Sequence, residues 1–286
     1  MAALSASGKE IVIASYNVEN YLSTDRRVNG QAEKTAPKPE SEIAALVDVL
    51  SEIRPDILGI IEMGDESMLE DFHARLKAAG MDFPHREWVK GADEHRHIAL
   101  LSRFPIVARN SRDDVGFELN GVPTRIGRGI LDVSVEPEPD FRLRLVGVHL
   151  KSRRQVPDFD ESAMRAKEAW YVREHLDRIF EADPGAKVML FGDLNDTKNQ
   201  YPVRELIGSA KSPGYMRDLF LTDGVGQRWT HFWSAADVYS RIDYLLVSRG
   251  LWPAINMEKS GISRSRIWFK ASDHRAVFAT IKVPEE

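Results

Sequence analysis

Short apolar runs rich in β-branched residues recur along this chain from its beginning to its end. Runs of about four to eight such residues, bounded by turn-forming residues, are typical of buried strands. Together with a few helical segments they predict an α/β (α+β) sandwich in which both faces of the sheets are covered. The runs are Ile11–Ser15, Ile57–Ile61, Ile98–Leu101, Ile130–Val135, Leu143–Leu150, Val188–Phe191, Ile242–Val247 and Ala276–Ile281.

Two segments have the periodicity of amphipathic helices. Ser41 is a suitable N-cap for a helix whose apolar residues, from Ile43 to Ile53, fall on one face. A second helix is predicted over Glu161–Phe180. The polar segment Asn20–Glu40 predicts a long loop after the first strand, and Glu136–Pro139 predicts a turn between two strands. The buried side of the second helix is expected to comprise Ala169, Val172, Leu176, Ile179 and Phe180.

Length and composition favour one domain that spans residues 1–286, with residues 1–9 as a disordered tail. Apolar residues make up 43% of the chain, which is enough for a substantial core, and there is no internal repeat. The absence of cysteine excludes disulfides, zinc–thiolate sites and thiol nucleophiles. No apolar run is long enough for a transmembrane segment or a signal peptide. We therefore expect a monomer that is either cytoplasmic or exported with its signal peptide removed.

Polar residues cluster where the apolar runs stop. A carboxylate beside an apolar strand is costly to bury unless a partner or a metal offsets its charge. Six such interruptions suggest that the strand ends converge on one charged site, which is where open sheets usually bind ligands. The residues at these ends are Asn17, Glu19, Glu62, His149, Lys151, Asp193, Asn195, Asp243, Asp273 and His274.

The side chains in these clusters indicate a reaction class. Most offer only oxygen, which suits the hard cations Mg²⁺ or Mn²⁺ better than zinc. His149 and His274 lie in the same clusters and can donate to an anionic substrate or exchange protons with it. A hard cation, several carboxylates and two histidines fit hydrolysis of a phosphoester.

Eight motifs follow one another along the chain: SYNVENYL (15–22), GIIEM (59–63), ALLSRFPI (99–106), RGILDV (128–133), VGVHLKS (146–152), FGDLND (191–196), RIDYLLVS (241–248) and SDHRAV (272–277). In this order they resemble the endonuclease/exonuclease/phosphatase superfamily, whose fold is that of deoxyribonuclease I and exonuclease III. The resemblance covers nearly the whole chain, and eight motifs in order are far more specific than any one of them. It implies a four-layer sandwich, in which two mainly antiparallel sheets pack face to face and are flanked by helices.

The resemblance also implies roles for individual residues. The metal, Mg²⁺ or Mn²⁺, would be held by Glu62 and Asn17, with Asp273 facing it and Glu19 as a less regular ligand. Asp193 would orient or deprotonate the attacking water, and Asn195 would hold that water or a phosphate oxygen. His149 would donate to a non-bridging phosphate oxygen. His274 would act as the acid/base or charge-stabilising residue, with Asp243 fixing its ring. Neighbouring strand residues face opposite ways, so we expect Asp243, and not the adjacent Asp273, to hydrogen-bond that ring.

Basic residues near the motifs are candidates for substrate binding: Lys151, Arg96, Arg128, Arg153 and Arg154. Arg264 and Arg266 are further candidates for contact with a phosphate backbone. His97 is expected to line the cleft, and the other histidines, His231 among them, are expected at the surface or in structural roles. Core packing is the expected role of Trp229, Trp233 and Trp268, with stacking on a base or sugar as the alternative.

The residues within these motifs limit the type of reaction more closely than they limit the substrate. The segment RIDYLL lacks the cysteine-containing arginine motif of inositol-polyphosphate phosphatases, and IIEMG lacks the glutamine and lysine that flank the metal glutamate in abasic-site endonucleases. The wording is most similar to the bacterial branch that includes extracellular nucleases. A formal net charge of −5 excludes a general basic field for nucleic acid but allows a local basic groove.

We therefore expect a divalent-metal-dependent endonuclease or phosphodiesterase that cleaves phosphodiester bonds by in-line attack of water on nucleic acid or another phosphoester. A phosphatase that acts on small-molecule or lipid phosphoesters is the alternative. A non-catalytic binding module on the same fold is disfavoured, because every expected catalytic position is filled.

Overall fold

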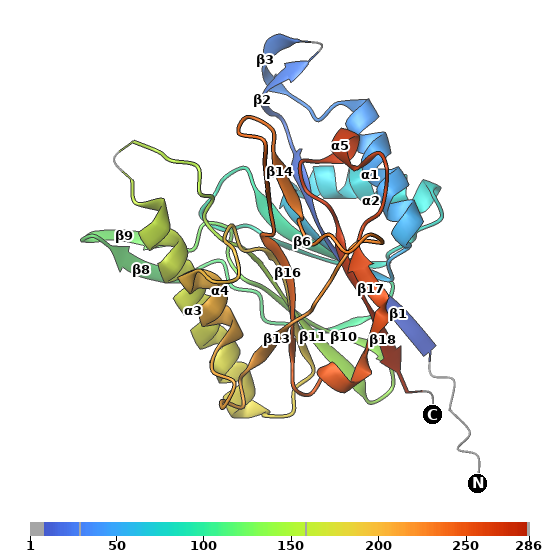
Figure 1. The fold of residues 1–286 in the computed structure, drawn as a ribbon, viewed down its shortest axis with the longest axis vertical. Helices are drawn as coiled ribbons and strands as arrows, with labels where there is room; N and C mark the ends of the chain where they lie inside the picture. Colours follow the sequence, from blue (N-terminus) through green and yellow to red (C-terminus); the bar gives the residue numbers. More distant parts are fainter. Residues whose placement is uncertain (1–8, 29, 158, 285–286) are drawn as a thin grey trace.

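Two six-stranded sheets pack against each other in the centre of the molecule (Figure 1). The computed structural model describes residues 9–28, 30–157 and 159–284. The first sheet consists, in spatial order, of β17 (Ile255–Ile262), β18 (Val277–Val283), β1 (Lys9–Tyr21), β4 (Ile57–Met63), β6 (His97–Ser102) and β5 (His85–Val89). The second consists of β13 (Met216–Asp218), β16 (Asp243–Ser248), β12 (Val188–Asp193), β11 (Phe141–His149), β10 (Leu131–Glu138) and β7 (Ile106–Arg109).

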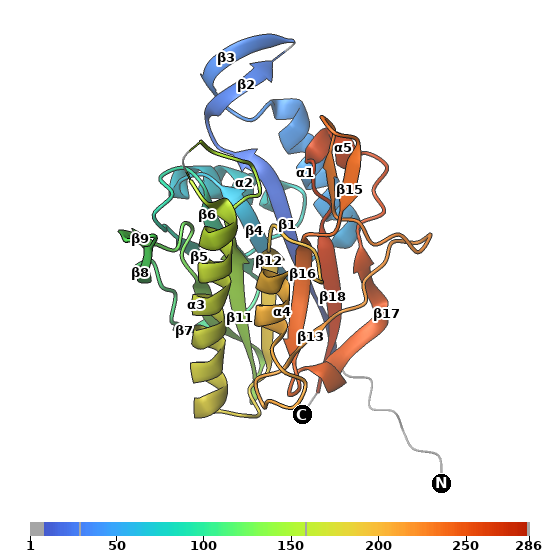
Figure 2. The same ribbon diagram turned by 60° about the vertical axis from the view of Figure 1, so that its left-hand side comes forward.

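Helices cover the outer face of each sheet and complete the four predicted layers. The longer helices are α1 (Glu40–Ile53) and α2 (Glu66–Ala78) on the first sheet and α3 (Glu161–Ala182) and α4 (Tyr201–Ile207) on the second. Figure 2 shows α3 and α4 running along the outside of the second sheet. Separate apolar clusters fill the space between the sheets and the space under each helix pair. The predicted sandwich is confirmed.

Most neighbouring strands are antiparallel, as predicted, and each sheet contains one parallel pair. The parallel pairs are β1 with β4 and β11 with β12. The carboxyl ends of two parallel neighbours lie at the same edge of a sheet. The four strands that end in Asn17–Tyr21, Glu62–Met63, His149 and Asp193 therefore bring their polar ends to one side of the molecule.

The segment 20–40, predicted to be a loop, instead contains a β-hairpin. Its strands are β2 (Thr24–Val28) and β3 (Gln31–Ala36), and the hairpin projects beyond the rest of the fold in Figure 1. The Asn-Gly pair at 29–30 in the sequence is a strong hairpin signal that outweighs the polar composition of the segment. Arg26 fastens the hairpin to the end of β1 by donating to the carbonyl oxygens of Asn20 and Leu22.

The helix prediction needs three corrections. α1 begins at Glu40, one residue before the expected cap Ser41, because the carbonyl of Pro39 already accepts the backbone N–H groups of Glu42 and Ile43. α3 continues to Ala182. The sequence analysis missed α2, although Asp65 caps its first turn through the backbone N–H of Met68. The buried residues of α2 are Leu69, Phe72 and Leu76.

Smaller elements complete the chain. The turn predicted at Glu136–Pro139 comes slightly later, because β10 extends to Glu138. Lys9, assigned to the disordered tail, begins β1, and the rest of that tail lies outside the described residues. No helix in the described part of the chain is long and apolar enough to cross a bilayer. The remaining elements are β8 (Gly116–Leu119), β9 (Val122–Arg125), β14 (His231–Trp233), β15 (Val238–Ser240), η1 (Trp252–Ala254) and α5 (Trp268–Ala271).

Candidate active site

Three predicted site residues lie side by side on the second sheet. In the strand register His149 is opposite Asp193, and Asp193 is opposite Asp243. Register partners point to the same face of a sheet. The three side chains therefore form a row where β11 and β12 end and β16 begins. We call this part of the molecule, together with Asn17, Glu62, Asp273 and His274 of the first sheet and its loops, the polar edge.

The first sheet contributes its residues across a close contact between the sheets. The ring of Phe191 from β12 lies against Gly59 of β4, where a Cβ atom would come within 2.2 Å of the ring. Glycine therefore allows the strands to approach closely next to the site. Nδ2 of Asn17 donates to Oδ2 of Asp193 over 3.3 Å, and this hydrogen bond joins the two sheets at the polar edge.

Several site residues have backbone conformations that non-glycine residues rarely adopt. The φ angles are 47° for Glu19, 66° for Glu62 and 51° for Asn195. Each lies in the left-handed region, where L-residues are strained, and such residues concentrate at functional sites. Hydrogen bonds to distant segments hold two of these side chains: Oε2 of Glu62 accepts from the backbone N–H of Asn20, and Oε2 of Glu19 accepts from that of Asp273.

His274 lies at the centre of the polar edge. Its Nδ1 atom is 2.8 Å from Oδ2 of Asp243, which confirms the predicted hydrogen bond. Its Nε2 atom faces the carboxylates of Asp193 and Asp273, each at 3.8 Å. Burial alone would lower the pKa of the ring, but Asp243 and Asp273 raise that pKa well above its usual value. The His274 ring therefore favours the protonated form.

His149 has the opposite electrostatic environment. Its Nε2 atom lies 3.8 Å from both Oε1 of Glu62 and Oδ2 of Asp193, beyond ordinary hydrogen-bond distance. Within the described part of the chain, its buried Nδ1 atom has no hydrogen-bond partner. Burial lowers the pKa of the ring well below its usual value, and the positive charge of Arg128 acts in the same direction. His149 is therefore a neutral ring with one N–H to donate.

Negative charge is concentrated at this edge. Burial, together with the charge of Asp243, raises the pKa of Asp193 to about 8. Burial and the charge of Asp273 raise the pKa of Glu19 to about 7. Raised carboxylate pKa values mean that the site repels further negative charge. A bound cation would relieve that repulsion.

Two groups of side chains at this edge could hold a cation. Each group places one potential ligand atom from every member within 4.8 Å of the others: Asp193, Asp243 and His274, and His231, Asp273 and His274. Because Nδ1 of His274 is hydrogen-bonded to Asp243, its Nε2 atom is the one that could face a cation. The predicted ligand Glu62 lies outside both groups; its Oε1 atom lies 3.8 Å from Nε2 of His149, and its Oε2 atom accepts from the backbone N–H of Asn20.

Asn195 is held firmly beside Asp193. Its backbone N–H donates to Oδ1 of Asp193 over 2.8 Å, and its side-chain Nδ2 donates to the carbonyl of Leu150 over 2.9 Å. A second, longer contact of 3.3 Å joins Nδ2 to Oδ2 of Asp193. The two residues therefore behave as one rigid unit at the end of β12.

The predicted substrate-binding residues differ in burial. Arg128 is buried and pairs with Asp93 over 3.2 Å, and its Nε atom has no hydrogen-bond partner among the described residues. Arg96 is half-buried in the adjacent loop, and its backbone N–H donates to the same Asp93. The Lys151 ammonium lies 5.3 Å from the centre of the Phe159 ring. The remaining candidates, Arg153, Arg154, Arg264 and Arg266, are exposed.

His231 belongs to the site, although the sequence analysis expected a surface or structural role. Its ring packs at 4.7 Å from the ring of His274, and its Nε2 atom lies 3.6 Å from Oδ2 of Asp273. An isolated bridge between the two histidine backbones produces this contact. Because that bridge joins segments far apart in the chain, no local sequence signal reveals it. His97, expected to line the cleft, is buried against Trp88.

An aromatic surface adjoins His231. We call it the aromatic rim, and it comprises Trp229, Phe232, Trp233, Tyr239, Trp268 and Phe269 from β14, β15, α5 and the chain before β14. Phe232 stacks on Tyr239 at 4.4 Å, and Trp229 and Trp268 meet edge to face. Trp233 is 57% exposed and Phe269 63%, so the expectation of core packing is wrong for Trp233.

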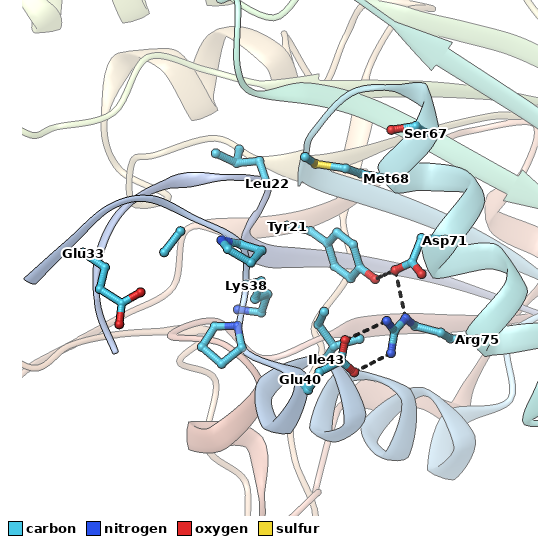
Figure 3. A pocket seen from close by; sticks show the side chains of 13 residues that line it. Tyr21, Leu22, Glu33, Lys38, Glu40, Ile43, Ser67, Met68, Asp71 and Arg75 are labelled. Carbon is cyan, nitrogen blue, oxygen red and sulfur yellow. Dashed lines mark hydrogen bonds and ion pairs between the residues drawn. The ribbon is translucent and has the colours of Figure 1, made fainter. Parts of the chain in front are cut away.

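A cavity of about 440 Å³ lies next to the β2–β3 hairpin, and His149, Asp193 and Asp243 are not among the residues that line it (Figure 3). Four of its polar side chains are paired with one another. The Tyr21 hydroxyl donates to Asp71, and Arg75 binds both Asp71 and Glu40. These four groups are therefore already satisfied without a ligand.

The model of the Endonuclease/Exonuclease/phosphatase family matches residues 14–274. A comparison with curated proteins gave no match.

Solved structures share the fold at low sequence identity. Truncated TDP2 from Caenorhabditis elegans is 17% identical, with a TM-score of 0.62, over 96% of this chain and 98% of that one. The human Nocturnin catalytic domain, with bound sulfate anion, is 15% identical, with a TM-score of 0.66, over 96% and 95%. Sphingomyelinase C from Streptomyces griseocarneus is 16% identical, with a TM-score of 0.60, over 96% and 100%. From the family match along nearly its whole length, the chain belongs to the endonuclease/exonuclease/phosphatase family.

Proposed function

We propose that this member of a family of divalent-metal-dependent phosphoesterases is a phosphodiesterase, with nucleic acid as its substrate. The observation that carries the proposal is the position of two histidine rings, His149 and His274, on either side of Asp193. His274 is biased towards the cation and His149 towards the neutral ring. Both Nε2 atoms lie 3.8 Å from Oδ2 of Asp193. A phosphate bound over Asp193 would therefore meet one charged and one neutral donor.

The residues around Asp193 divide the work of in-line attack. Asp193 would accept the proton of the attacking water once a cation relieves the repulsion from Asp243 that raises its pKa. Asn195, fixed to Asp193, would orient that water or a phosphate oxygen. His274 would donate a hydrogen bond from Nε2 to the phosphoryl group as negative charge grows on its oxygens, while Asp243 keeps the ring oriented. His149 would donate to a non-bridging oxygen.

A cation would be held by Glu62 and Asn17, with Asp273 and Glu19 nearby. It would neutralise the phosphate and stabilise the charge that develops on it. The all-oxygen donor set of Glu62 and Asn17 supports Mg²⁺ or Mn²⁺.

Arg128 and Arg96 support binding of the phosphate next to His149. The buried guanidinium of Arg128 carries an unused Nε donor, which an anion would satisfy. Lys151, Arg153 and Arg154 follow His149 on the same loop, and they would contact a longer, polyanionic substrate.

The experiment that tests this function is a substrate panel with Mg²⁺ or Mn²⁺. Plasmid DNA, RNA, bis-p-nitrophenyl phosphate and p-nitrophenyl phosphate are incubated with the protein and with Asp193→Asn. We expect hydrolysis of at least one diester, loss of that activity in Asp193→Asn, and little action on the monoester. Hydrolysis of the monoester alone would instead make the protein a phosphatase.

A second candidate, hydrolysis of a lipid phosphoester, is favoured by the aromatic rim. Exposed aromatic side chains beside a catalytic edge can bury themselves in a lipid interface. Sphingomyelinase C is among the proteins with this fold. Vesicles that contain sphingomyelin or phosphatidylcholine test the candidate. It predicts release of phosphocholine, and Trp233→Ser should reduce that release without changing hydrolysis of bis-p-nitrophenyl phosphate.

A further inference from the structure

Helix α3 carries a buried carboxylate that the proposed reaction does not use. Glu168 is fully buried, and its two oxygens accept backbone N–H groups from two separate segments. Oε1 accepts from Gly127 over 2.9 Å, and Oε2 accepts from Lys151 over 2.5 Å. Gly127 directly precedes Arg128, and Lys151 follows His149 by two residues. One carboxylate therefore joins the segment that follows His149 to the segment that contains Arg128.

A second buried charge on the same helix face completes this attachment. Nη1 of Arg165 donates to the carbonyl of Lys151 over 3.1 Å, and Nε donates to Asp196 over 3.0 Å. The N–H and the C=O of Lys151 are thus held by residues one helical turn apart. Asp196 directly follows Asn195. The pair Arg165 and Glu168 consequently fixes three loops at the polar edge.

Packing alone does not explain a carboxylate at this position. The neighbouring residues on the buried side of α3, Ala169 and Val172, contact the apolar core of the second sheet. An ionised group in such surroundings is costly unless its hydrogen bonds are satisfied. Burial raises the pKa of Glu168, whereas Arg128 and the two N–H donors act against that rise. Two accepted N–H groups are best matched by the ionised form, which has no proton to place between them.

We propose that Glu168 is a positioning residue. Its carboxylate fixes the segment that follows His149 relative to the segment that contains Arg128, so that both side chains can face the substrate phosphate. The inference rests on the proposed phosphodiesterase function. Glu168 does not touch the polar edge itself; it acts through the backbone of Gly127 and Lys151. Errors of about 1 Å in the placement of such groups can cost on the order of 10²-fold in rate.

Glu168→Gln tests the proposal, because it preserves side-chain volume but can accept only one of the two N–H groups. Arg173→Met is the matched control. Arg173 is a buried charge on the same helix, and it binds the carbonyls of Leu206 and Gly214, away from the site. We expect both variants to lose thermal stability, while kcat on bis-p-nitrophenyl phosphate falls roughly 10–100-fold in Glu168→Gln alone. KM should change less than kcat.

Amide resonances provide a readout that does not depend on activity. Charge-assisted hydrogen bonds are short and strong, so the amide protons of Gly127 and Lys151 should resonate at low field. In Glu168→Gln at least one should move upfield, and the ring signals of His149 should shift with it. In Arg173→Met these signals should stay in place. If the protein cleaves no phosphodiester, the proposed function fails, yet these resonances still decide whether Glu168 positions His149.

Two results would overturn the proposal: unchanged kcat and unchanged His149 signals in Glu168→Gln, or an equal loss of kcat in Arg173→Met. Should Glu168→Gln not fold, Glu168→Asp keeps the charge and shortens the reach by one methylene. The same comparison with Arg173→Met then applies, with the same expected differences in kcat and in the His149 signals.

Discussion

The ring of His274 and the carboxylate of Asp243 are joined by a hydrogen bond of 2.8 Å between Nδ1 and Oδ2. The neighbouring Asp273 lies instead 3.8 Å from Nε2, on the opposite side of the ring. Asp243 is itself fixed, because its backbone N–H donates to the hydroxyl of Thr230. The hydrogen bond at Nδ1 therefore orients the ring, and Nε2 faces the carboxylates of Asp193 and Asp273.

We predict from this pair that His274→Ala lowers kcat on a phosphodiester by on the order of 10²–10⁴-fold, since it removes a proton donor. Asp243→Asn should cost less, because the ring remains but loses its orienting charge. Steady-state kinetics and thermal denaturation measure both effects, and the melting temperature of Asp243→Asn should change little. A larger loss for Asp243→Asn than for His274→Ala would contradict the assigned roles.

The proposed binding of a hard cation by Glu62 leads to the second prediction. EDTA should abolish hydrolysis, and Mg²⁺ or Mn²⁺ should restore it. Glu62→Gln should weaken Mn²⁺ binding in isothermal titration calorimetry, because the neutral amide is a poorer ligand for a hard cation. Glu258→Gln, at an exposed carboxylate of β17, serves as the control and should bind as the parent does. Full activity in EDTA would remove the metal from the mechanism.

The exposed arginines lead to the third prediction. If Arg153, Arg154, Arg264 and Arg266 contact a phosphate backbone, cleavage of DNA should decrease steeply as salt rises. Replacing all four by Gln should flatten that dependence, because each lost phosphate contact lowers the salt slope by about one. Hydrolysis of bis-p-nitrophenyl phosphate, which has one phosphate, should be affected far less. An unchanged slope for DNA would favour a small or lipid substrate.

Much of the fold could be predicted because its strands are buried on both faces. Runs such as Ile57–Ile61 and Val188–Phe191 are continuous and apolar, which makes both their position and their type evident. Their polar ends converge because each run belongs to a parallel pair. The hairpin at 24–36 and helix α2 were missed because both are polar on much of their surface and pack through few apolar residues.

The supporting residues of the site could not be predicted. Glu168 and Arg165 act on backbone groups of distant loops, and a backbone N–H or C=O leaves no mark in the sequence. In the periodicity of α3 a charged residue is normally assigned to the solvent side. His231 likewise reaches the site through a bridge to His274 that links segments more than forty residues apart. The residue types in the sequence identify the site residues at the strand ends. Only the tertiary structure identifies the residues that hold them in place.

A buried charge network remote from the polar edge allows a test of stability. Asp132 of β10 is completely buried, and it accepts from Nε of Arg144 over 2.8 Å. Nε2 of His175, from α3, lies 2.7 Å from Oδ2 of the same carboxylate. Burial acts to raise the pKa of Asp132, but the hydrogen bonds from His175 and Arg144 outweigh it, so the pKa lies below its usual value. The network thus ties α3 to the second sheet.

The fourth prediction concerns how this network responds to pH. Because the pKa of Asp132 is lower in the folded than in the unfolded chain, its contribution to stability is complete above the unfolded value of about 3.9. The contribution is lost as the pH falls through the lower, folded value. Asp132→Asn should therefore reduce the free energy of unfolding by about 3–5 kcal/mol at pH 7. Urea denaturation should show this difference shrinking below pH 4, whereas Asp114→Asn, at an exposed ion pair with Arg112, should change stability little at any pH. A difference for Asp132→Asn that stays constant down to pH 3 would mean that the ionised carboxylate does not stabilise the fold.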